Sequence, residues 1–277
     1  MRVKKRVTFV FLSLPHIIFF IIFSGHVFAN TTDKASNTAE GQASILITYI
    51  PSIDEEDKLA ASHIKQSQSV ETVLELSQHI IPFDPPVKIV FGAKDGPLYD
   101  PELHQIDIPY AFWRHATERF TSSISEKSYS KKDHDIVQVS SSDALLHTLL
   151  HELGHAYVAA NDIPILGKEE DAVDNFATVI LLNHVTNGDA IAMSAAELFA
   201  LEDEQVDHFD NLDFIGEHSL DIQRYYYTLC LIYGSNPESY PRLLDDIDKP
   251  FKTEQEEICV EEFHRVSENW AAYLTDS

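Results

Sequence analysis

The stretch from His147 to Ala177 reads HTLLHELGHAYVAANDIPILGKEEDAVDNFA and contains residue types that bind metal ions. His151 and His155 stand four residues apart, so on a helix their imidazole rings lie one turn above each other and can face one point. Catalytic zinc sites use three protein ligands and one water molecule in a tetrahedron. The spacing therefore predicts two of three zinc ligands. His147 lies on the same face, but three histidines along one straight helix cannot all converge on one ion.

Glu152 follows His151 directly, which places its side chain about 100° further around the helix axis. In that position the carboxylate lies beside a metal rather than on it. A carboxylate there can accept a proton from water, as the general base of metal-assisted hydrolysis. The same helix carries an apolar face for the core, made of Leu145, Leu146, Leu149, Leu150 and Leu153.

A third ligand is expected from the next predicted helix, which opens with Glu169, Glu170, Asp171 and Asp174. Glu170 and Asp174 are four residues apart and share a face. We predict that Glu170 binds the metal and that Asp174 accepts a hydrogen bond from a ligand imidazole, which fixes the tautomer of that ring. Acids at a helix start also stabilise the helix dipole, and this is the alternative explanation of the cluster.

Hydrolysis also needs a hydrogen-bond donor for the negative charge that develops on the attacked oxygen. The segment Glu217–Arg224 is the best candidate region. Within it we predict His218 as the donor, oriented by Asp221 or Glu217. Arg224 could serve there as a fixed cation, and it is at least equally well explained as one member of a buried ion-pair cluster between helices.

Hydrophobic spacing and chain breakers predict the elements that position these residues. In the first part of the chain, strands are expected at 43–50 and 87–92, a hairpin at 97–110 that turns at 100–104, and helices at 53–81, with a break near 66–69, and 111–120. The Ser-, Lys- and Asp-rich stretch 121–142 is expected to be mostly loop, with a short extended piece at 136–139. A helix capped by Ser142 or Asp143 follows, and further helices are expected at 168–185, 190–203, 218–233, 237–246 and, from a capping box at 253–256, to about 274.

This order of elements predicts an α+β fold. A small β-containing lobe of about residues 43–142 is expected to pack on a mostly helical lobe of about residues 143–277, within one domain. The polar, patternless residues 30–42 are predicted to be a disordered leader.

The amino-terminal segment 1–29 is predicted to be a secretory signal peptide. Four basic residues precede an apolar run at 7–23, and Val27-Phe28-Ala29 supplies a cleavage context. An uncleaved membrane anchor is the alternative, although Pro15 and His16 interrupt the run. We therefore expect an exported protein, periplasmic or secreted, without stable membrane insertion after cleavage.

Removal of this segment leaves 16 Lys and Arg against 45 Asp and Glu, a net charge of −29. Such a chain repels phosphate backbones and anionic lipids, which excludes nucleic acid and membrane surfaces as expected partners. The only two cysteines, Cys230 and Cys259, are expected to form a disulfide in an exported protein. In the chain-entropy view a loop of this length contributes roughly 3–4 kcal/mol.

Three stretches resemble a known family: HELGHAYVAANDIPILGKEEDAVDNFA (151–177), EHSLDIQRYYYTLCLIYGSNP (217–237) and EEICVEEF (256–263). They are similar to exported bacterial proteins described as "putative metallopeptidases", formerly a domain of unknown function. The resemblance covers most of the chain from about residue 45. It implies a zincin-like active-site helix, a Zn²⁺ cofactor held by His151, His155 and Glu170, and a disulfide at the two matching cysteines.

The chain departs from the family pattern at DGPLYDPELHQIDIPY (95–110). It keeps Tyr99-Asp100-Pro101 but lacks the cysteines that flank this motif in the family, so no amino-terminal disulfide is implied. In metallopeptidases of this general kind a strand edge pairs with extended substrate. Gln105–Pro109 and Ile136–Val139 are the two segments expected to do so here, and both are equally explained as structural strands.

Together these features predict a zinc-dependent hydrolase, most simply a metallopeptidase that acts on a peptide or protein substrate with Glu152 as general base. The alternative from a different class is a non-catalytic, exported metal- or protein-binding module that keeps the zinc site. A hydrolase of non-peptide amides, such as cell-wall material, would use the same residues. The sequence leaves the substrate, the choice of endo- or exo-cleavage and the oligomeric state open.

Overall fold

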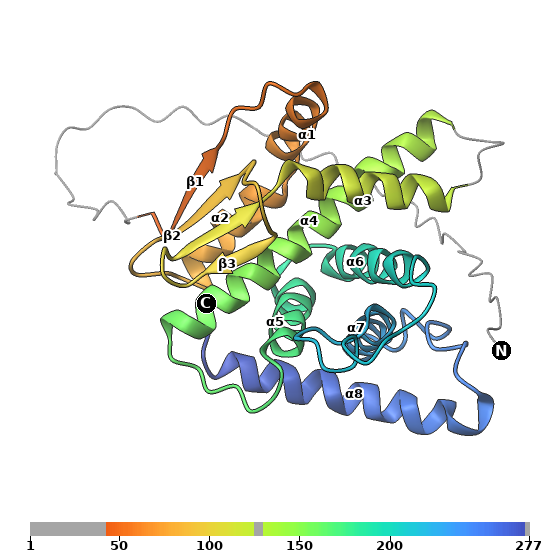
Figure 1. The fold of residues 1–277 in the computed structure, drawn as a ribbon. Coiled ribbons are helices and arrows are strands. Elements are labelled where there is room, and N and C mark those ends of the chain that lie inside the picture. The colour runs from red at the N-terminus through yellow and green to blue at the C-terminus, as the bar shows by residue number, and fades with distance from the viewer. Residues whose placement is uncertain (1–42, 125–129, 275–277) are drawn as a thin grey trace, which may run out of the picture. The chain divides into compact units, whose positions relative to one another are not determined.

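The computed structural model describes residues 43–124 and 130–274 (Figure 1). The predicted signal peptide (1–29) and the predicted leader (30–42) lie outside these residues. Among the helices in the described ranges, none combines the length and the hydrophobicity needed to cross a lipid bilayer.

The amino-terminal part contains a four-stranded sheet with the order β1-β2-β4-β3. β1 (Ile45–Tyr49), β2 (Val87–Phe91) and β4 (Gln105–Ile108) are parallel, and β3 (Leu98–Asp100) pairs antiparallel with β4 at the edge. Side chains alternate between the two faces of the sheet. One face is buried and is formed by Ile45, Val87, Ile89, Phe91, Ile106 and Ile108. The two strands and the hairpin predicted from alternation are confirmed.

Two helices connect β1 to β2, as a parallel pair requires. They are α1 (Glu55–Gln66) and α2 (Ser69–His79), so the predicted break near residues 66–69 is confirmed. The side chain of Asp54 caps α1 by accepting the backbone N–H groups of Glu56 and Asp57. After the sheet, α3 (Tyr110–Ser123) covers the helix predicted at 111–120.

The helix that carries the histidine motif is α4 (Lys131–Ala160), and it begins twelve residues before the expected cap. The prediction of a loop at 121–142 was therefore wrong for its second half, and Ile136–Val139 is helical rather than extended. The true start is a capping box, in which Ser130 and Asp133 satisfy each other's backbone N–H groups. The hydroxyls of Ser141 and Ser142 donate to carbonyls four residues earlier, so serine continues this helix.

The remaining helices are α5 (Glu169–His184), α6 (Gly188–Asp203), α7 (Asp221–Ser235) and α8 (Lys249–Ala271). The helix predicted at 237–246 is absent. This described stretch is a series of turns with isolated backbone hydrogen bonds between residues three apart, and Pro241 has no backbone N–H to donate. α8 starts at Lys249 with a proline in its first turn rather than at the capping box predicted at 253–256.

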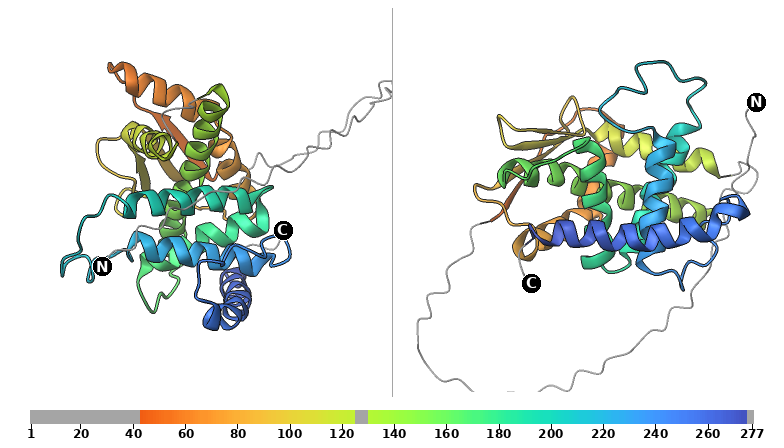
Figure 2. Two further views of the ribbon diagram at one scale, coloured as in Figure 1. Left: turned by 90° about the vertical axis from the view of Figure 1, so that its right-hand side faces the viewer. Right: turned by 90° about the horizontal axis from the view of Figure 1, so that it is seen from below.

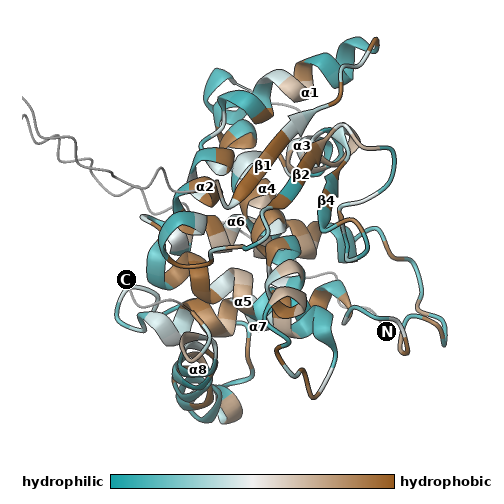
Figure 3. Cartoon of the chain, turned by 90° about the vertical axis from the view of Figure 1, so that its left-hand side faces the viewer, coloured by the Kyte–Doolittle hydropathy of each residue, from teal (hydrophilic) through white to brown (hydrophobic). Residues whose placement is uncertain are grey.

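The core joins the sheet to the helices, and the middle of α4 is buried on nearly all sides. Figure 3 shows β1 and β2 mostly hydrophobic, whereas the outer helix α8 is mostly hydrophilic. The predicted disulfide is confirmed: Cys230 of α7 is bonded to Cys259 of α8. The fold is α+β, as predicted, with the sheet in the amino-terminal region. The lobe boundary expected at 142/143 falls inside α4, because that helix begins earlier.

Candidate metal centre

The two histidines of the motif and one carboxylate of α5 meet at a single point. The Nε2 atom of His151 lies 3.1 Å from Oε2 of Glu170, and Nε2 of His155 lies 3.2 Å from the same oxygen. One ligand atom from each of the three residues lies within 4.8 Å of the other two. Zinc bonds of about 2.0–2.2 Å in a tetrahedron place ligand atoms roughly 3.3–3.6 Å apart, so this group fits such an ion. The predicted helix pair brings all three predicted ligands together.

α5 reaches α4 because a glycine lies between them. A Cβ atom at Gly154 would lie 2.9 Å from Cβ of Val173 and 3.1 Å from Cδ1 of Phe176. Any larger residue at position 154 would push the first turns of α5 away from the imidazoles of His151 and His155. Gly154 thus sets the distance between the helix that carries the histidines and the carboxylate of Glu170.

The second nitrogen of each imidazole is held by a carboxylate. Nδ1 of His151 lies 2.7 Å from Oδ1 of Asp174, and Nδ1 of His155 lies 2.8 Å from Oε1 of Glu169. A hydrogen bond from Nδ1–H to a carboxylate leaves the Nε2 lone pair for a metal and fixes the ring orientation. The structure places Asp174 where the sequence predicted it. Glu169 was missed, because helix periodicity grouped it with the apolar face of α5, while its place in the first turn lets it reach back to α4.

Asp174 is itself held by a cation of α7. Arg224 donates through Nε to Oδ2 of Asp174 at 2.7 Å and through Nη2 to Oδ1 at 3.0 Å, and its Nη1 lies 3.3 Å from Asp221. The guanidinium also stacks on the ring of Phe199 at 3.9 Å. Arg224 is therefore a member of a buried ion-pair cluster, the alternative considered from the sequence. Through Asp174 this cluster contacts His151, a predicted metal ligand.

The charges of the cluster shift the pKa values of its members. Burial alone would lower the pKa of His151, but hydrogen bonds to Asp174 and Glu170 raise it to about 9. Burial alone would raise the pKa of Glu170, but bonds to three imidazoles hold it well below its usual range. Asp174 behaves in the same way, because Arg224 and His151 outweigh its burial. Both carboxylates are therefore ionised at neutral pH.

Glu152 is 5% exposed and lies among the same residues. Burial raises the pKa of its carboxyl, and the neighbouring His151 and His155 oppose that rise. A carboxylate whose pKa is raised toward neutrality is better matched to proton transfer than a solvated one. Glu152 is not among the three residues whose ligand atoms converge, and its role as general base stays a prediction.

His218 reaches the same centre from the segment before α7. Its Nε2 atom lies 2.9 Å from Oε2 of Glu170, and its ring stacks on that of His151 with centroids 5.9 Å apart. Lys168 Nζ donates to the backbone carbonyl of His218 at 3.1 Å, and the hydroxyl of the next residue, Ser219, donates to Asp171 at 2.9 Å. The side chain remains half exposed, so it faces both the site and solvent.

Other histidine and strand predictions resolve differently. His147 is buried away from the centre, where Nε2 lies 3.4 Å from the hydroxyl of Thr178, and burial lowers its pKa to about 4. It is a neutral core residue. Gln105–Pro109 does not offer a free edge, because Gln105–Ile108 is β4 and pairs with a strand on each side. With Ile136–Val139 in a helix, neither predicted substrate-pairing segment is available.

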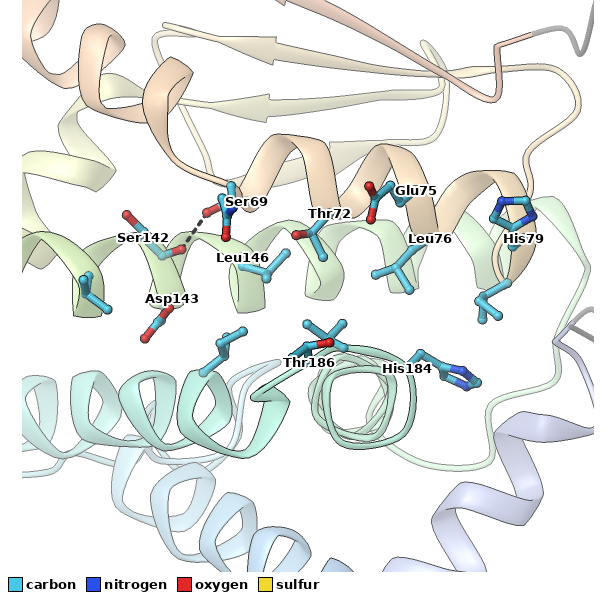
Figure 4. A pocket seen from close by; sticks show the side chains of 15 residues that line it. Ser69, Thr72, Glu75, Leu76, His79, Ser142, Asp143, Leu146, His184 and Thr186 are labelled. Carbon is cyan, nitrogen blue, oxygen red and sulfur yellow. Dashed lines mark hydrogen bonds between the residues drawn. The ribbon is translucent and has the colours of Figure 1, made fainter. Parts of the chain in front are cut away.

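A separate cavity of about 600 Å³ lies between α2, α4 and the α5–α6 junction (Figure 4). Its walls include Ser69, Asp143 and His184, and none of the residues of the metal centre. Burial raises the pKa of Asp143 to about 6, while a hydrogen bond from Ser194 opposes that rise. The candidate chemistry is therefore at the α4–α5 contact and not in this cavity.

Comparison with known proteins gives one match. Neither a curated protein nor a solved structure is similar to the chain. The sequence profile of one family matches residues 49–274, which include every residue of the metal centre. That family is described as "putative metallopeptidase", and the chain belongs to it.

Proposed function

We propose that the protein is a zinc-dependent peptidase that acts outside the cytoplasm. The observation that carries this proposal is the convergence of His151 Nε2, His155 Nε2 and one oxygen of Glu170 next to the buried carboxylate of Glu152. Two imidazoles and one carboxylate are the ligand set of many catalytic zinc sites, which keep the fourth position for water. Bound zinc would supply Lewis acidity toward the carbonyl and would lower the pKa of a coordinated water.

The residues of the chain would divide the remaining work. Glu152 would accept the proton of the attacking water and pass it to the leaving amine. His218, half exposed and 2.9 Å from Glu170, would donate a hydrogen bond to the oxyanion. Asp174 and Glu169 would hold the two ligand rings in the tautomer that frees Nε2. The disulfide and the predicted signal peptide support the proposed location.

The test separates metal binding from catalysis. Purified protein should contain one zinc per chain by elemental analysis, and His151→Ala should lose it. Glu152→Gln should retain the metal, while peptide hydrolysis falls by a factor of about 10²–10⁴. Glu254→Gln, an exposed acid on α8, is the matched control and should keep full activity.

Two outcomes would replace the proposal. Bound zinc without hydrolysis of peptides or of peptidoglycan would favour the non-catalytic module. Hydrolysis of peptidoglycan amides alone would keep the site chemistry but change the substrate class. Activity that survives in zinc-loaded Glu152→Gln would show that Glu152 is not the base.

A further inference from the structure

The loop between α6 and α7, Glu204–Leu220, exposes apolar side chains and reaches the metal centre through His218 near its end. Leu212, Phe214 and Ile215 are 70%, 59% and 77% exposed, and the ring of Phe209 contacts that of Phe214. In Figure 2 this segment, coloured between the teal of α6 and the blue of α7, stands out from the helices on either side. We call it the acidic–apolar loop. Exposed apolar clusters of this kind mark binding surfaces.

The charge of the loop has one sign. It contains five acids, Glu204, Asp207, Asp210, Asp213 and Glu217, and no Lys or Arg. All five are exposed, and no Lys or Arg of the described chain lies within ion-pair distance of them. The loop is nevertheless ordered by its own acids: Asp210 accepts the N–H of Leu212 at 2.6 Å, and Asp213 accepts that of Asp210 at 2.7 Å.

The loop is continuous with the candidate catalytic residues. Its last turn carries His218, whose Nε2 lies 2.9 Å from Glu170. Gly216 lies between this histidine and the apolar part in the chain, and its surroundings are open, because a Cβ there would approach no atom more closely than the carbonyl of Leu212 at 3.6 Å. A polymer that extends from the metal centre along this loop would meet the exposed leucine, phenylalanine and isoleucine side chains, which are flanked by carboxylates without a Lys or Arg partner among the described residues.

We propose that the acidic–apolar loop binds the substrate beside the scissile bond and selects peptide segments that are both cationic and apolar. This inference rests on the proposed function, because it assigns a substrate class to the same site. Apolar side chains of the peptide would cover Leu212, Phe214 and Ile215, and its Lys or Arg residues would pair with the loop carboxylates. Complementary charge of this kind steers association and rejects acidic partners. The same carboxylates repel anionic lipid, which argues against a membrane surface as the occupant.

Binding is measured on the zinc-loaded Glu152→Gln protein, so that turnover does not interfere. The probes are fluorescent twelve-residue peptides of alternating Lys and Leu, a version with Glu for Lys and a version with Ser for Leu. The first loop variant replaces Leu212, Phe214 and Ile215 with Ser, and the second replaces Asp207, Asp210 and Asp213 with Asn, which can still accept the loop hydrogen bonds. The matched controls on α8 are Phe251→Ser/Ile258→Ser and Glu254→Gln/Glu257→Gln/Glu261→Gln, which alter residues that are also exposed.

We expect the Lys/Leu peptide to bind about tenfold more weakly to each loop variant, with the α8 controls within about twofold of the parent. Salt should weaken binding to the parent and to the Ser variant, but much less to the Asn variant. Equal affinity for the Lys and Glu peptides, or equal losses in the loop and α8 variants, would overturn the proposal. So would parent self-association that the Ser variant abolishes, because the loop would then bind a second copy of the chain.

Failure of this inference differs from failure of the proposed function. If the protein with Glu152 intact cleaves peptides without preference for Lys/Leu flanks, the peptidase stands and the loop assignment falls. If the Lys/Leu peptide binds through the loop but neither it nor any other peptide is cleaved, the loop stands as a peptide-binding surface, and the peptidase falls together with the loop's place beside a scissile bond.

Discussion

The two candidate ligand histidines of the metal centre are supported in opposite ways. His151 and Asp174 are buried, and Arg224 with Asp221 and Phe199 extends their contacts into the helical core. His155 is held by Glu169, whose side chain is 47% exposed and makes no further ion pair with the residues that the structure describes. One half of the site is thus fixed by the fold, and the other half by a single surface side chain.

This difference follows from where each carboxylate lies on α5. Asp174 is in the second turn, which faces α4 and α7, whereas Glu169 is the first residue of the helix. A buried charge requires partners, and the burial strengthens the hydrogen bonds among them. An exposed pair is screened by solvent and contributes little. Perturbing the buried half should therefore have the larger effect on zinc binding.

The largest effect is expected for Asp174→Asn. The amide cannot supply the charge that orients His151, and because an NH₂ group replaces one carboxylate oxygen, Arg224 loses one of its two hydrogen bonds to this side chain. Zinc affinity, measured by competition with a chromophoric chelator, should fall roughly 100-fold. Asp135→Asn, at an exposed position of α4, should leave the affinity unchanged. An unchanged zinc affinity in Asp174→Asn would show that the buried support of His151 matters no more for zinc binding than the exposed support of His155.

Arg224→Met should act mainly on stability. It removes the guanidinium from the buried carboxylate of Asp174, and breaking such a pair destabilises a fold by about 3–5 kcal/mol. Urea denaturation measures this loss, and zinc affinity should fall by roughly tenfold because Asp174 is no longer fixed. Arg242→Met is the control: its ion pair with Asp245 lies on the surface, so the expected loss is about 0–1 kcal/mol.

The pH dependence of stability should report the buried pair. The pKa of His151 is about 9, above its ordinary value of 6.5. In chelator-treated protein its charged form therefore stabilises the fold fully below pH 6.5, and this contribution is lost as the pH rises through about 9. The lowered pKa of Asp174 keeps that carboxylate charged throughout this window. The free energy of unfolding should fall between pH 6.5 and 9, and Asp174→Asn should flatten the curve; the same slope in the variant would contradict the assignment.

Glu169→Gln should have the smallest effect. The amide oxygen can still accept the hydrogen bond from His155, and the site is open to water. Zinc affinity should fall by less than about tenfold, the lower end for such supporting residues. Glu55→Gln changes the same position of another helix, the first residue of α1, and controls for the helix dipole. A loss in Glu169→Gln equal to that in Asp174→Asn would show that exposure does not govern the support of the rings.

Much of this centre was predictable because it depends on local periodicity. The four-residue spacings of His151 and His155, and of Glu170 and Asp174, fix faces of two helices before any tertiary structure is known. Glu169 was not predictable, since its contact depends on how the two helices cross. The same holds for Gly154, whose packing against Val173 sets that crossing, and for Arg224, which two readings of the sequence explained equally well.

The predictions of secondary structure were wrong where the residue composition indicates a loop but the local hydrogen bonds form a helix. Serines at 140–142 resemble a loop, yet Ser141 and Ser142 bond to the preceding helical turn. The capping box at Ser130 was overlooked, while the similar pattern at Thr253 lies inside α8. The order of the strands in the sheet could not be predicted from hydrophobic periodicity either. That order makes β4 an internal strand and β3 an edge strand.

The distance between α7 and α8 near the Cys230–Cys259 disulfide also affects the distant metal centre. Gly234 lies directly against the carbonyl of Cys259, so any side chain at position 234 would force the two helices apart. α7 also carries Arg224, ten residues or about 15 Å back along the helix axis. A displacement of α7 at Gly234 would therefore also move Arg224. Because Arg224 holds Asp174 and Asp174 orients His151, a methyl group added at position 234 is expected to misalign the imidazole of His151 without touching it.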